Sequence, residues 1–270
     1  MLFLLNETSH GEASFHLSSW VHLLAESLGD SPLAAFLTRW EKTIYSFIVV
    51  ALISFGAFAV TRKKGQVPTH AQLMVEQIVI GLNSLVTGVL GPAGRAYTPF
   101  IGTLFIYILV SNLFGLIPLQ NSTMSFLTTT VPIALSVFLY VQWVGITKNG
   151  LGGYLFHLAG SPKEIFGYVL VPLNLPLHIL GEFIKPLSLS FRLYGNVMAG
   201  HILLGVFVML GIQALAPLHI PAGIPFHIPF LFLEIMVGLI QAFVFTLLST
   251  VYIAMMLPHE EHAAEHHGAH

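Results

Sequence analysis

One arginine stands inside a long apolar stretch in the C-terminal half of the chain. Residues 188–201 read Ser-Leu-Ser-Phe-Arg-Leu-Tyr-Gly-Asn-Val-Met-Ala-Gly-His, and no Lys or Arg follows Arg192 up to His270. An arginine at mid-bilayer costs about 2.5–3.5 kcal/mol on insertion scales, so such residues are rare and usually functional. Because a guanidinium keeps its proton, this fixed charge is suited to holding off or exchanging a mobile negative charge.

The residues around Arg192 are small or polar on one face of the expected helix. At about 100° per residue, Asn196 lies one turn after Arg192, with Ser188, Gly195 and Ala199 beside them. Small residues let another helix approach closely. The face therefore predicts either a sliding contact with another helix or a static packing contact.

Further protonatable groups lie on the same tract and on the last one. His201 is nine positions after Arg192 and faces elsewhere, whereas Glu234 and Gln241 are seven positions apart and share a stripe. Taken alone, His201 fits a hydrogen-bonded packing histidine better than a functional one. Glu234 favours a function, because an unpaired buried carboxylate is costly. Together they suggest a water-lined proton path.

Glu182 and Lys185 are three positions apart and can form a local salt bridge. Glu182 precedes Arg192 by ten positions, or about 15 Å along a helix, too far for a direct pair. Arg192 therefore has no carboxylate partner nearby in sequence. Its partner is either Glu234 or a group on another subunit.

The composition places these residues in an all-α polytopic membrane protein. Of 270 residues, 55% are hydrophobic and 8% are charged, against about 25% charged in soluble domains, and the mean hydropathy is +0.82. The net charge of −2 leaves no basic face for nucleic acid. The absence of cysteine excludes disulfides and thiolate sites.

We expect an extramembrane N-terminal arm (1–40), a single membrane domain (41–257) and a disordered His/Glu-rich tail (258–270). Five spans are predicted, at about 44–60, 100–119, 126–146, 165–214 and 226–257. Residues 70–91 are too polar to cross the membrane and are predicted to form an amphipathic helix at the interface.

The last two tracts are longer than a hydrocarbon core of about 30 Å needs, so they must be strongly tilted or broken. Pro172 and Pro176 predict a kink or a separate short helix in the first of them.

The basic residues predict the orientation. With these spans, Arg62, Lys63, Lys64, Arg95, Lys148 and Lys163 fall on one side, and Arg39 and Lys42 on the other. This asymmetry places the N-terminus outside and the C-terminus in the cytoplasm.

Three segments resemble the signatures of subunit a of F-type ATP synthase. They are Lys185-Pro-Leu-Ser-Leu-Ser-Phe-Arg-Leu-Tyr-Gly-Asn196, then Leu239-Ile-Gln-Ala-Phe-Val-Phe245 with Val251-Tyr252, and Ser111-Asn-Leu-Phe-Gly-Leu-Ile-Pro118. They cover three of the five predicted spans in the family's order. The resemblance also extends to the number of spans and to their orientation.

The resemblance implies a stator subunit of the bacterial inner membrane, beside a rotating ring of c subunits. Peripheral-stalk b subunits and the ATPase catalytic head would complete the complex, and this chain would have no catalytic site and no cofactor of its own. Arg192 would face the ring carboxylate between two aqueous half-channels, and Asn196 and Gln241 match polar positions near it. The translocated ion would be H⁺, with Na⁺ left open.

The chain departs from the family at two positions. The family often has a carboxylate nine positions after the arginine and a histidine on the last helix, whereas here His201 and Glu234 exchange these types. The exchange keeps one acid and one imidazole, which supports their pairing on the outer half-channel. Glu182 either borders the cytoplasmic half-channel or forms only a salt bridge with Lys185. Ser188, Lys185 and His178 are expected to be supporting residues.

Two other functions would also place polar residues inside a membrane protein. An ion-coupled secondary transporter predicts an internal repeat with broken helices in matching halves, and no such repeat is evident in the sequence. A haem-binding membrane subunit would use His157, His178 or His201 as axial ligands and needs paired histidines at matched depth.

Overall fold

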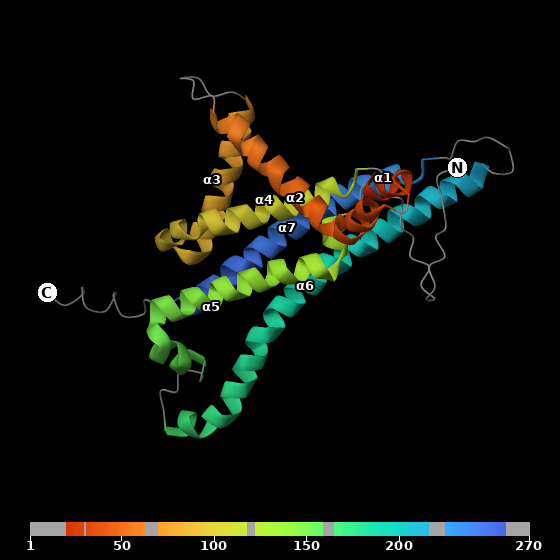
Figure 1. The fold of residues 1–270 in the computed structure, drawn as a ribbon. Coiled ribbons are helices and arrows are strands. Elements are labelled where there is room, and N and C mark those ends of the chain that lie inside the picture. The colour runs from red at the N-terminus through yellow and green to blue at the C-terminus, as the bar shows by residue number, and fades with distance from the viewer. Residues whose placement is uncertain are drawn as a thin grey trace.

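The structure is a computed structural model that describes residues 20–29, 31–62, 70–117, 122–158, 165–215 and 225–257. The predicted disordered tail (258–270) and half of the predicted N-terminal arm (residues 1–19 and 30) lie outside the described residues. The regular elements of the described part are all helical, as Figure 1 shows. This confirms the predicted all-α class.

The helix bounds follow the apolar tracts of the sequence but are mostly longer than the predicted spans. The helices are α1 (Trp20–Ser27), α2 (Pro32–Arg62), α3 (His70–Leu90), α4 (Thr98–Phe114), α5 (Leu127–Leu158), α6 (Ile165–Leu215) and α7 (Ile228–Met256). Two 3-10 turns, Pro92–Ala96 and Thr123–Ser125, precede α4 and α5. Helix α2 begins well before the predicted span at 44–60, and α4 ends before the predicted limit at 119.

Helix α7 lies at the centre of the bundle, because it packs against α4, α5 and α6 (Figure 1). Its side chains Ala242, Phe245 and Ile253 are fully buried. Ile101 of α4 and Leu193 of α6 are also fully buried in the same core. The core therefore includes all three tracts whose motifs resemble the family's signatures, together with buried residues of α3 and α5 such as Val86 and Val137.

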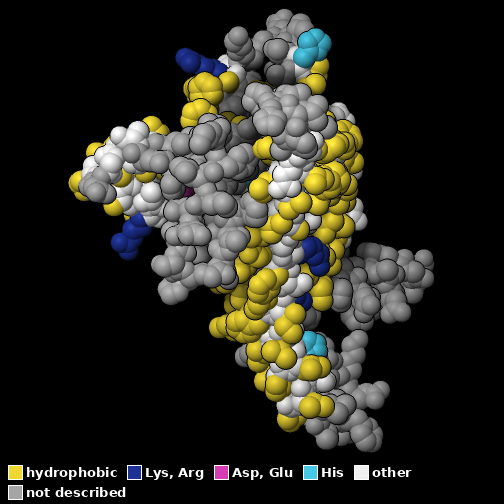
Figure 2. All heavy atoms as spheres, turned by 90° about the vertical axis from the view of Figure 1, so that its right-hand side faces the viewer, with side chains coloured by type: hydrophobic (Ala, Val, Ile, Leu, Met, Phe, Trp, Pro, Cys, Tyr) yellow, Lys and Arg dark blue, Asp and Glu magenta, His cyan; other side chains and the backbone are white. Residues whose placement is uncertain are grey.

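The outer surface is apolar. Figure 2 shows hydrophobic side chains over much of the described surface in that view, with a few isolated basic ones among them. By length and composition, five described helices could cross a membrane: all of α2 and α7, and most of α3, α5 and α6. A soluble protein would bury such side chains, so this surface fits contact with lipid.

Helices α3 and α4 differ from the prediction in length. Helix α3, expected at the interface, is long and apolar enough to cross, whereas α4, expected to cross, is a shorter apolar helix. In Figure 1, α3 runs at a steep angle to α4 and α7. Its placement at the interface stays a prediction that rests on the polar residues within it.

Two helices are bent. Helix α6 is continuous but curves strongly in its first part (Figure 1), where Pro172 and Pro176 each remove a backbone donor. Helix α5 is interrupted at Gly150, whose φ of 68° and ψ of 165° are not helical. Only glycine adopts such a conformation at little cost, and the turn sends residues 151–158 in a new direction.

Candidate functional site

Arg192 lies on the exposed face of α6, close enough to α7 for its charge to act on the hydroxyl of Tyr252. Leu189, Leu193 and Val197 are buried in the bundle, and their spacing fixes the inward face of the helix. Arg192 and Ser188 lie on the exposed face. Among the described residues, Arg192 forms no ion pair. The guanidinium therefore points to the outside of an apolar surface without a carboxylate partner from the described part of its own chain.

One hydrogen bond joins the polar stripes of α6 and α7. The amide of Asn196 donates through Nδ2 to Oε1 of Gln241 over 3.3 Å. Gln241 is buried, and its Nε2 has no hydrogen-bond partner within the described residues. Since buried polar groups are normally paired with protein or water, this nitrogen marks a position where water would be stabilised.

The carboxylate of Glu234, from α7, lies beside Gly200 of α6, the residue before His201. A Cβ built on Gly200 would overlap the carboxyl carbon and both carboxylate oxygens of Glu234. Glycine at this position therefore makes room for the acid. Glu234 and His201 form no direct hydrogen bond or ion pair with each other in the structure, so their predicted pairing, directly or through a water, stays a prediction.

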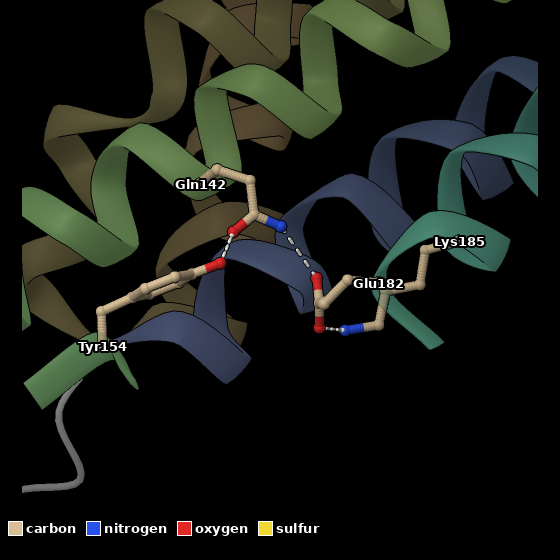
Figure 3. Close-up of polar contacts among 4 residues, drawn as sticks. All are labelled: Gln142, Tyr154, Glu182 and Lys185. Carbon is tan, nitrogen blue, oxygen red and sulfur yellow. Dashed lines mark hydrogen bonds and ion pairs between the residues drawn. The ribbon is translucent and has the colours of Figure 1, made fainter. Parts of the chain in front are cut away.

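Glu182 sits in a network of four side chains, drawn in Figure 3. It forms the expected ion pair with Lys185 through Oε1, and its Oε2 accepts from Nε2 of Gln142 over 3.1 Å. The hydroxyl of Tyr154 donates to Oε1 of the same Gln142. The ammonium of Lys185 also lies 5.5 Å from the ring centre of Tyr252, from α7. Three helices thus meet around this carboxylate.

His178 is an exposed residue of α6 whose Nδ1 lies 3.1 Å from the carbonyl oxygen of Asn174. Within the described residues, His178 forms no hydrogen bond or ion pair with the Glu182 network or with His201. The side chain of His157 lies outside the described residues. Within the described part, no group of three or more His, Asp or Glu residues is placed to hold a metal ion.

Gln142 and Tyr154 were not among the site residues predicted from the sequence. Gln142 carried a usable signal, because it is a polar residue inside the predicted span 126–146. Tyr154 carried none, because only the turn at Gly150 brings its hydroxyl back to Gln142. Asn112 was noticed only as part of a motif, and it donates through Nδ2 to the carbonyl of Gly238 over 3.1 Å, joining α4 to α7.

The structure therefore presents two polar zones on α6, one around Glu182 and one around Gly200 and His201. Arg192 lies between them, about 15 Å along the helix from Glu182 and about 12–14 Å from Gly200 and His201. The zones are separated by the buried apolar residues Leu189, Leu193 and Val197 on the inward face. On the described part of α6, Arg192 therefore stands apart from both polar zones.

Comparison with known proteins decides the family. Residues 43–254 match the family described as ATP synthase A chain. The chain belongs to this family. The protein named ATP synthase subunit a of Protochlamydia amoebophila is 41% identical over 91% of this chain and 90% of its own length. Proteins of the same name from Dinoroseobacter shibae (37% identical, 88% and 93% covered) and Aliarcobacter butzleri (36%, 83% and 92%) are also similar.

Family membership confirms the resemblance seen in the motifs. The chain is a membrane subunit of a multi-subunit ATP synthase and takes part in ATP synthesis and proton transport. The alternative of an independent secondary transporter is thereby replaced. The matched region contains every side chain placed above, from Asn112 to Tyr252.

Proposed function

We propose that this subunit is the proton-translocating stator of a rotary ATP synthase. It provides two aqueous half-channels and the arginine, Arg192, beside which carboxylates of a rotating c ring exchange protons. The observation that carries the proposal is the outward-facing Arg192 on an apolar surface, with no ion pair to the described residues of its own chain. The partner charge then comes from another subunit.

The physics of a buried carboxylate supports this role. A ring carboxylate must be neutral while it faces lipid, because burying the ion costs far too much. Beside Arg192 the ion is favoured, by about 4 kcal/mol at 4 Å with an effective dielectric of 20. Each carboxylate therefore releases its proton as it nears the arginine and takes one up as it leaves. Rotation follows if the two exchanges connect to opposite sides of the membrane.

The two polar zones on α6 supply the two connections. We assign Glu234 and His201, with Asn196 and Gln241 nearby, to the outer half-channel, and Glu182 to the cytoplasmic one. The excess of basic residues predicts an outer N-terminus and a cytoplasmic C-terminus, which puts the start of α6 on the cytoplasmic side. Each proton that crosses about 100 mV then releases about 2.3 kcal/mol to turn the ring.

The proposal names the partners. The exposed face of α6 around Ser188, Arg192 and Ala199 would meet the c ring, because these side chains other than Arg192 are small. The b subunits of a peripheral stalk would hold this subunit against the ring and connect it to the ATPase head. Purification of the intact assembly from bacterial inner membranes should therefore recover a c-type ring and an ATPase head with this chain.

The deciding experiment is Arg192→Lys, with Arg95→Lys as the matched control at an exposed arginine outside the two polar zones. Lysine can lose its proton when buried and lacks the planar fork. We expect Arg192→Lys to abolish ATP-driven proton pumping in inverted vesicles, while the amount of assembled complex and the pumping of the control stay normal. Pumping at the wild-type rate by fully assembled Arg192→Lys complexes would overturn the proposal.

A further inference from the structure

In the network around Glu182, each hydrogen bond has a defined donor and acceptor, and the proposed function assigns no role to Gln142 or Tyr154. Tyr154 donates to the carbonyl oxygen of Gln142, so the amide nitrogen of Gln142 must face Glu182, as Figure 3 shows. Lys185 takes the other oxygen of Glu182. Both carboxylate oxygens therefore face donors, which is the arrangement that an ionised carboxylate requires.

The position of Tyr154 depends on two glycines. Gly150, at φ 68°, turns the chain so that a residue twelve positions after Gln142 returns to it. A Cβ on Gly145 would lie 3.3 Å from two ring carbons of Tyr154 and 3.4 Å from the sulfur of Met256. Asn149 then ties this end of α5 to α7, because its Nδ2 donates to the carbonyl of Met256 over 2.7 Å. The hydroxyl is thus brought to Gln142 by a specific fold of the chain.

When Glu182 is protonated, Gln142 has to accept a hydrogen bond from it instead of donating one. A protonated carboxyl has an O–H that needs an acceptor, and Gln142 offers its carbonyl oxygen there only when its amide turns over. The NH₂ group then faces Tyr154, whose hydroxyl oxygen can accept. A tyrosine hydroxyl serves both arrangements, whereas a phenylalanine at this position serves neither.

We propose that Tyr154 and Gln142 are positioning residues that hold Glu182 in place in both of its protonation states, so that it can pass protons on the cytoplasmic side. The inference rests on the proposed role of Glu182 in the cytoplasmic half-channel. The other titratable groups that face the network are Lys185 from α6 and Tyr252 from α7. Lys185 stabilises only the ionised state, so the neutral state depends on the Gln142–Tyr154 pair.

The test uses the intact ATP synthase in inverted membrane vesicles, with the pumping rate expressed per assembled complex. Tyr154→Phe is expected to lower ATP-driven pumping about five-fold, the size of one lost hydrogen bond to a polar network. Gln142→Leu should lower it by at least as much. The matched control is Tyr140→Phe on the same helix, because the described contacts of Tyr140 are stacking on Phe100 and other ring contacts.

A double replacement separates positioning from a merely structural effect. If Tyr154 acts through Glu182, Tyr154→Phe has no further effect once Glu182→Gln is present. A structural role would lower the rate by the same factor in both backgrounds. Equal factors, or wild-type pumping by Tyr154→Phe, would overturn the inference.

The proposed function can survive that failure, because it is tested separately at Arg192. Wild-type pumping by Glu182→Gln would reject Glu182 as a proton carrier and this inference with it. The outcome of Arg192→Lys would still decide whether the subunit translocates protons.

Discussion

Two charged residues of helix α6, Glu182 and Arg192, have opposite surroundings: one is paired within the chain and the other is exposed. Glu182 has its two oxygens bonded to Lys185 and Gln142, with Tyr154 behind Gln142. Arg192, about 15 Å further along the helix, is exposed and has no ion pair within the described part of the chain. A charge in an apolar slab is stable only when it is paired or hydrated, and the proposed function gives Arg192 its partner on the c ring.

The difference fits the two roles that the proposed function gives these residues. A carboxylate with its donors in place is held by its own subunit. An arginine with small residues around it can meet a series of partners in turn. Under the proposed function, one helix combines a fixed site and an exchange site, and the following predictions test that division.

The largest expected difference is in stability. Lys185→Met leaves Glu182, whose side chain is only 13% exposed, without its cation, and should destabilise the subunit by about 2 kcal/mol, between the values for exposed and buried pairs. Arg192→Met removes no pair and should change stability by less than about 0.5 kcal/mol. The measurement is the Tm of this subunit purified in detergent without the ring, because the proposed partner charge of Arg192 is present only in the complex. Equal Tm values for the two variants would contradict the division.

The next effect concerns the second polar zone. Gly200→Ala adds a methyl group that overlaps the carboxylate of Glu234, so the acid must move. We expect about a ten-fold loss of pumping, or about 1.4 kcal/mol on the barrier. Gly205→Ala on the same helix is the matched control, because nothing lies within 4 Å of its new Cβ. If both variants pump alike, the position of Glu234 beside Gly200 has no role in transport.

The smallest effect is the coupling between Asn196 and Gln241. Each replacement by leucine removes one end of a 3.3 Å hydrogen bond and should slow pumping about five-fold, or roughly 1 kcal/mol. The double variant should be no slower than the worse single one, because the same contact is lost only once. Rates that multiply instead would show that the two amides act independently.

The sequence predicted the class, the tracts that form the helices and the residue types that matter. Charge is so costly in lipid that a lone Arg192 in an apolar tract was sufficient to single out that position. The local pair of Glu182 and Lys185 was also predictable, because a spacing of three on a helix places both on one side. The exact ends of α2 and α5 were not, since apolar residues continue past the length that a bilayer needs.

The contacts between distant segments were decided by the tertiary structure. The sequence of a helix shows which residues share a face but not which other helix packs against that face. The hydrogen bond from Asn196 to Gln241 and the contact of Glu234 with Gly200 therefore appear only in the packed bundle. The partnership of Tyr154 with Gln142 depends on a single backbone turn at Gly150. Sequence determines a helix by local hydrogen bonds and hydrophobic period, whereas the pairing of polar groups depends on how whole helices pack.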